Sequence, residues 1–111
     1  MMIQFVSQDI EWTESMKGCV QKKIIAPLAH VMNSDDFEIS IHLDLERKRV
    51  LSQPPKLEMW IVLQTFDGRA NEVVRDLDDN FLNLVHQLST QMRWLRPRYA
   101  QQSVVVGVGN I

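Results

Sequence analysis

The chain has 111 residues, 45% of them hydrophobic, and a net charge of −2 at pH 7, so it can form one domain with one core but is not a polycation. Its single cysteine, Cys19, excludes an internal disulfide and a multi-cysteine zinc site. Because the N-terminus lacks a basic region followed by a long apolar run, we expect neither a signal peptide nor a membrane span, and a cytoplasmic location.

The first predicted elements are a short strand and a helix. Apolar and polar side chains alternate over residues 2–8, which predicts a strand with Val6 on its outward face. Thr13 begins a helix, and Trp12 just before it can pack back on the first turn. Pro27 ends or kinks this helix.

Two further strands are predicted in the middle of the chain. Apolar residues alternate with polar ones over residues 37–46, which is the most regular strand pattern in the sequence. A basic connection with two prolines then leads to a strand over residues 57–64. The outward face of this strand carries Trp60 and Val62, so it is only half polar.

The pattern of residues 71–96 predicts one long helix. Their apolar side chains recur at intervals of three and four, and the helix would have roughly 25 residues. Asn71 can cap its first turn, and Pro97 stops it. The first half carries three acidic residues that suit the helix dipole better than a catalytic pair. They are Asp76, Asp78 and Asp79.

These elements predict an α+β fold. It is a two-layer α/β sandwich of order β-α-β-β-α, or β-α-β-β-β-α if a short fourth strand precedes the last helix, with two helices packed on one face of a small sheet. We assign residues 1–99 to this domain and residues 100–111 to a C-terminal tail. The segment from Ser103 to Gly109 is either a strand or a flexible tail.

Two motifs resemble the ribosome hibernation-promoting factor and ribosome-associated translation inhibitor family. Each is mostly an amphipathic helix pattern, and their occurrence in order, over residues 2–96, carries the resemblance. The first motif is Trp12-Thr13-Glu14-Ser15-Met16-Lys17, followed by Val20 and Lys23-Ile24; the second is Leu77, Phe81, Leu84 and Gln87-Leu88.

The resemblance implies a β-α-β-β-β-α fold that binds the small ribosomal subunit in the decoding channel. In that family, basic residues of both helices face ribosomal RNA and block tRNA and mRNA, with no catalytic chemistry. This chain departs from the pattern at Asn83 and His86, where the family's long helix carries Lys and Arg. The short distance between Gly68 and the helix also leaves little room for a fourth strand, and a three-stranded sheet would offer an edge to another chain.

The candidate RNA-binding residues are cations from both helices, the mid-chain loop and the end of the long helix. Because the whole molecule is acidic, they must meet in one local patch to hold phosphates. Solvated helix lysines, and arginines that complement a helix dipole, are the alternative explanation. The candidates are Lys17, Lys22, Lys23, Arg47, Lys48, Arg49, His86, Arg93, Arg96 and Arg98.

The alternative function is a homodimeric interaction domain that kept the fold and lost ribosome binding. In a monomer, Val6, Trp60 and Val62 would form a hydrophobic patch exposed to solvent, and a partner copy could cover it. The sheet edge or the C-terminal tail could serve the same purpose.

Catalysis and metal binding have little support in the sequence. Cys19 lies on the apolar stripe of the first helix, which favours a core residue over a nucleophile. His30, His42 and His86 share no ligand spacing, so we expect no metal site. No glycine-rich phosphate loop, catalytic triad or nucleotide motif appears, and we expect no enzyme activity and no cofactor.

Overall fold

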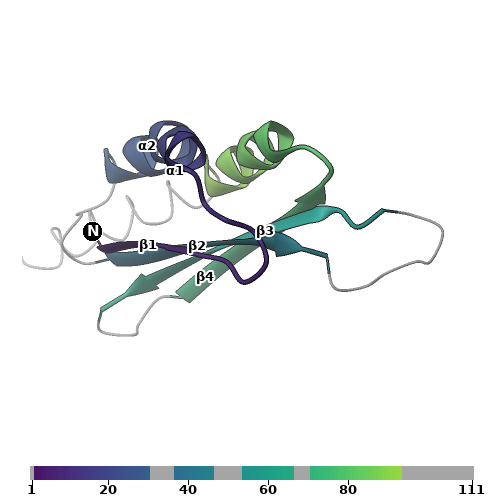
Figure 1. Ribbon diagram of the computed structural model, residues 1–111. Helices are drawn as coiled ribbons and strands as arrows, with labels where there is room; N and C mark the ends of the chain where they lie inside the picture. Colours follow the sequence, from purple (N-terminus) through teal and green to yellow (C-terminus); the bar gives the residue numbers. More distant parts are fainter. Residues whose placement is uncertain (1, 31–36, 47–53, 67–70, 94–111) are drawn as a thin grey trace, which may run out of the picture.

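The computed structural model describes residues 2–30, 37–46, 54–66 and 71–93 (Figure 1). Within these residues, four strands form one sheet and the helical segments lie side by side on one of its faces. The predicted α+β sandwich is confirmed, with the longer order β-α-β-β-β-α. The elements are β1 (Met2–Val6), α1 (Glu14–Val20), η1 (Gln21–Ile25), α2 (Ala26–Ala29), β2 (Phe37–Leu45), β3 (Leu57–Thr65), β4 (Asn71–Asp78) and a final helix described over residues 81–93.

The strands lie in the sheet in chain order, β1-β2-β3-β4. β1 runs parallel to β2 because the helical segment between them carries the chain back along the sheet, whereas β2, β3 and β4 pair antiparallel. Ile41 on β2 pairs with Phe5 on β1 and Ile61 on β3, and Ile61 pairs with Val74 on β4. Side chains that pair across strands share a face, so this row faces the helices.

The core lies between the sheet and the helices. Every second side chain of β2 is buried as far as Leu43, as the sequence pattern predicts. The first helical segment buries one stripe, and the predicted spacing of apolar residues is confirmed in the final helix. Fully burying each such side chain stabilises the fold by about 1.5–3 kcal/mol. The helical core residues are Val20, Ile24, Ile25, Leu28, Leu84, Val85, Leu88 and Met92.

Trp12, just before α1, joins β1 to the start of the final helix. Its ring lies 4.9 Å from that of Phe5 on β1 and 6.0 Å from that of Phe81 at the start of the final helix. Its indole N–H donates to the carbonyl of Val6 at 3.0 Å. Thr13 caps α1, because its hydroxyl accepts from the backbone N–H of Met16 at 3.2 Å.

Pro27 does not end the first helical segment. The chain widens into the π turn η1 and then continues as α2, with Pro27 in the first turn of α2. Proline has no N–H for the carbonyl four residues earlier, which belongs to Lys23. The hydroxyl of Ser89 in the final helix donates to this carbonyl at 3.2 Å. This contact ties the two helices together next to Pro27.

The predicted helix over residues 71–96 is wrong in its first part. Residues 71–78 form β4, and the final helix begins after Asn80, whose side chain accepts from the N–H groups of Leu82 and Asn83 at 2.8 and 3.2 Å. Asn80, not Asn71, is therefore the cap. The fourth strand that the sequence left little room for is present.

The acidic residues of this segment explain the error. Asp76 pairs across the sheet with the core residue Met59, and Asp78 with Leu57, which packs against the core, so both carboxylates point to the helix side. There the side-chain amides of Gln91 and Gln87 donate to them, each at 3.0 Å. Carboxylates on the covered face remove the apolar alternation that marks a strand, while the outward apolar residues mimic helical spacing.

The chain's C-terminal part lies beyond the described residues. This applies to the domain boundary at residue 99 and to the tail over 100–111, including the segment for which the sequence left a strand or a flexible tail open. Among the described helices, none is long and apolar enough to cross a membrane.

Candidate nucleic-acid interface

A groove runs between the first helical segment and the final helix, on the side away from the sheet. Each wall is a single helical stripe. Cys19, Lys22, Lys23 and Pro27 are spaced by three and four residues, and so are Leu82, His86, Ser89 and Arg93. Val85 closes the floor, where it is buried against the core.

The groove concentrates positive charge. The side chains of Lys22, Lys23, His86 and Arg93 are exposed, and the residues described as lining the groove include no carboxylate. Within the described part of the chain, Lys22, Lys23 and Arg93 form no ion pair. Their charges are therefore available to an anionic partner.

The π turn η1 and the hydrogen bond between Ser89 and Lys23 hold the cationic side chains of the groove in place. Lys22 and Lys23 both lie in η1, and π turns are frequent at functional sites. The hydrogen bond from Ser89 to the Lys23 carbonyl fixes the distance between the walls at the middle of the groove. The groove thus lies at a stable junction between two helices rather than on a loop.

Lys17 lies away from the groove. It is two residues before Cys19, which is roughly half a turn around the helix. Its ammonium group lies 3.7 Å from the carboxylate of Glu14 and 5.8 Å from the centre of the Phe5 ring. The structure thus brings together four of the ten predicted RNA-binding residues and separates Lys17 from them. The other five, Arg47, Lys48, Arg49, Arg96 and Arg98, are outside the described residues.

Cys19 is half-buried, packs against the core and also lines the groove. Its placement agrees with a packing role. No group of three metal-ligating side chains occurs within the described ranges, where His30, His42 and His86 lie on different elements.

The opposite face of the sheet carries the residues predicted as a partner interface. Trp60 pairs with His42 on β2, which pairs with Val6 on β1, and Val62 lies in the next row. The rings of His42 and Trp60 stack at 4.8 Å with an angle of 8° between them. Partial burial lowers the pKa of His42 below its ordinary 6.5, and the carboxylate of Asp44 only partly opposes this effect.

Sequence reasoning missed the residues that β4 adds to this face. Arg75 pairs with Trp60, its guanidinium carbon lies 5.6 Å from the centre of the indole ring, and its Nε lies 3.2 Å from the Glu58 carboxylate. Val73 and Leu77 are exposed beside it, at 55% and 39%. These residues carry no clear strand signal in the sequence, because the carboxylates on the covered face of β4 remove the apolar alternation that marks a strand.

Several solved structures share this fold. A ribosomal subunit interface protein from Coxiella burnetii matches with a TM-score of 0.63 and 14% sequence identity, covering 94% of this chain and 99% of that one. The Protein Y N-terminal domain from Thermus thermophilus matches with a TM-score of 0.58 and 20% identity, covering 86% and 99%. No protein-family model and no curated protein sequence matches. The resemblance to the hibernation factors is thus confirmed at the level of the fold.

Proposed function

We propose that this protein associates with the ribosome in the cytoplasm, binds RNA of the small subunit through the groove between its helices, and so restrains translation without catalysing a reaction. The observation that carries the proposal is the meeting of Lys22, Lys23, His86 and Arg93 in one groove free of described carboxylates. The fold shared with a ribosomal subunit interface protein supports the choice of partner.

The chemistry of the groove suits a phosphate backbone. Two lysines and an arginine offer multiple donors to phosphate oxygens, and each neutralised phosphate releases condensed counterions. Such contacts supply affinity and orientation rather than sequence readout. The protein therefore acts by occupying a site in the folded subunit.

Binding through three cations predicts a definite salt dependence. The slope of log K against log salt is about −0.7 to −0.9 for each phosphate neutralised. For three contacts, raising the salt from about 50 to about 200 mM should weaken binding about 20- to 40-fold.

The test is cosedimentation with purified small subunits over this range of salt. The double variant Lys23→Glu/Arg93→Glu should lose binding at low salt, because it places repelling charge on both walls of the groove. Lys23→Glu alone should weaken binding in the same direction, and Lys56→Glu, which makes the same single reversal at an exposed residue outside the groove, is its matched control. Wild-type protein that stays in the supernatant at low salt would refute ribosome association, and equal losses in the two single variants would refute the groove.

A further inference from the structure

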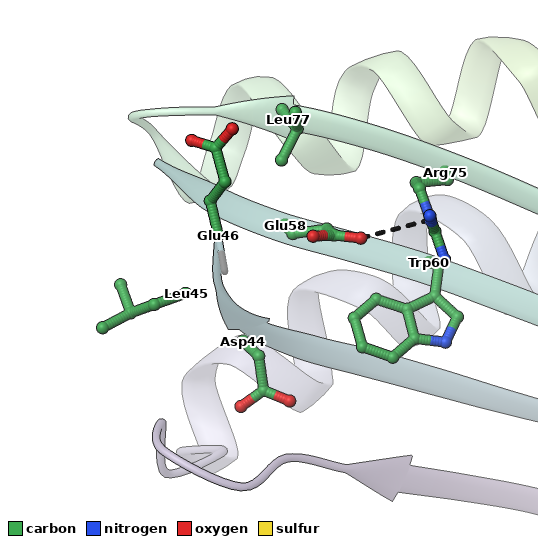
Figure 2. A pocket seen from close by; sticks show the side chains of 7 residues that line it. All are labelled: Asp44, Leu45, Glu46, Glu58, Trp60, Arg75 and Leu77. Atoms are coloured by element: carbon green, nitrogen blue, oxygen red, sulfur yellow. Dashed lines mark ion pairs between the residues drawn. The ribbon is translucent and has the colours of Figure 1, made fainter. Parts of the chain in front are cut away.

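The sheet face opposite the described helices holds a second hollow of opposite charge. It measures about 490 Å³ and lies beside the row formed by His42, Trp60 and Arg75 (Figure 2). Among the described residues, three carboxylates and one guanidinium line it, and together they carry a net charge of −2. Its lining residues are Asp44, Leu45, Glu46, Glu58, Trp60, Arg75 and Leu77.

The hollow already holds one guanidinium group, that of Arg75. Arg75 pairs with Glu58, whose side chain is only 19% exposed, and lies over the Trp60 ring. Figure 2 shows this pair beside the indole ring, with Asp44 and Glu46 across the hollow. An aromatic face with neighbouring carboxylates is the environment in which proteins bind arginine and lysine side chains.

The two remaining carboxylates have no cationic partner among the residues that the structure describes. Asp44 accepts the backbone N–H groups of Gln8 and Asp9 through Oδ1, at 2.8 and 2.9 Å, which anchors its position. Neither Asp44 nor Glu46 forms an ion pair within the described part of the chain. Both are half-buried, so a cation between them would be less screened than on an open surface.

Exposed apolar side chains adjoin the hollow on the same face. Val6, Val73 and Leu77 are 36%, 55% and 39% exposed, and Leu77 lines the hollow itself. A partner that fits this face therefore carries cationic side chains next to apolar ones. Carboxylates with no cationic partner in the described part of the chain would repel RNA phosphates, and a second copy would bring the same carboxylates on the same face.

We propose that this sheet face docks a basic segment of another protein, whose arginine or lysine side chain enters the hollow between Asp44, Glu46 and Trp60. The apolar neighbours of that side chain would cover Val73 and Leu77. This site is independent of the cationic groove, so a protein bound to RNA by its helices could hold a basic protein segment on its other side.

The test uses a labelled peptide in which arginine and valine alternate, with fluorescence anisotropy as the readout. A second peptide has citrulline, a neutral isostere, in place of arginine. The double variant Asp44→Asn/Glu46→Gln removes both charges, while the amide oxygen introduced at position 44 can still accept from Gln8 and Asp9. This variant should bind the arginine peptide about fivefold or more weakly, and the citrulline peptide should bind as poorly to the wild type.

Three further variants make the result specific. Glu38→Gln removes a carboxylate from the same face outside the hollow and should change nothing. Arg75→Gln removes the competing guanidinium and should tighten binding severalfold. Lys23→Glu/Arg93→Glu should leave peptide binding intact, which separates this proposal from the ribosomal one.

Three outcomes would overturn the proposal. They are no saturable binding of the arginine peptide, equal binding of the citrulline peptide, or equal binding by the wild type and Asp44→Asn/Glu46→Gln. A dimer mass in light scattering that Trp60→Glu converts to a monomer would assign the face to a second copy instead.

Discussion

At the scale of single residues, the position of a polar side chain around the final helix decides whether it lines the groove. The two sites where this chain lacks a basic residue of the resembled family, Asn83 and His86, are not equivalent. His86 lines the groove, whereas the amide of Asn83 donates to Asp78 on β4 at 3.3 Å. Of these two residues, only His86 therefore lies among the described residues that line the groove.

His86→Lys should strengthen binding to the small subunit. It adds a permanent charge where His86 lines the groove, so the salt slope should increase by about 1. Asn83→Lys adds the same charge outside the groove and should leave the slope unchanged while it removes the contact with Asp78. Cosedimentation over a salt series measures both, and a larger effect at residue 83 would contradict the placement of the groove.

Lys17 and Lys23 form a second matched pair on one helical segment. Lys17→Glu acts on a side chain that already lies beside Glu14 and Phe5, whereas Lys23→Glu acts inside the groove. We expect the reversal at Lys23 to weaken subunit binding about tenfold or more, and that at Lys17 to have a small, long-range effect. Equal losses would mean that the whole helix surface, not the groove, binds.

At the scale of elements, the final helix depends on local polar contacts at its start. Asn80→Ala removes the cap and should lower the free energy of unfolding by about 0.5–2 kcal/mol in urea denaturation. Asn71→Ala, at the exposed start of β4, is the control and should cost less. A larger loss at Asn71 would instead support a helix that begins there.

Asp78 makes the same junction sensitive to acid. The backbone N–H of Asn80 donates to its carboxylate at 2.9 Å, and the amides of Gln87 and Asn83 add to this, which holds the pKa of Asp78 below its ordinary 3.8. The unfolded chain then binds the proton more readily, so the stabilisation is complete above about pH 4 and is lost as the pH falls through the folded pKa. Urea midpoints of wild type and Asp78→Asn should therefore differ at pH 7 and converge as the pH falls through the folded pKa of Asp78. Parallel curves would contradict this role.

The same junction marks the limit of prediction from sequence. β2 has a covered apolar face and a polar outward face, so its alternation is plain, and the stripe of the final helix is equally plain from Leu84 to Met92. β4 reverses this arrangement, with carboxylates on the covered face that are satisfied by Gln87 and Gln91. Those partners are distant in sequence, so only the folded chain shows why acidic residues are tolerated there.

At the scale of the whole molecule, the fold places positive and negative side chains on opposite faces, which the small net charge does not reveal. A net charge of −2 resolves into a cationic groove on the helix face and an acidic hollow on the sheet face. The sequence identified the basic residues of the groove as candidates. It could not select four of them, because their convergence depends on how two helices pack across the sheet.

Directed hydroxyl-radical cleavage tests the central claim that the groove is the RNA-binding face. In a Cys19→Ser background, an iron chelate is attached through Leu82→Cys, at an exposed lip of the groove, or through Val73→Cys, on the opposite face. On the small subunit, the label at residue 82 should cut ribosomal RNA strongly and locally, and the label at residue 73 only weakly. Equal cutting from both positions, or stronger cutting from residue 73, would contradict the account.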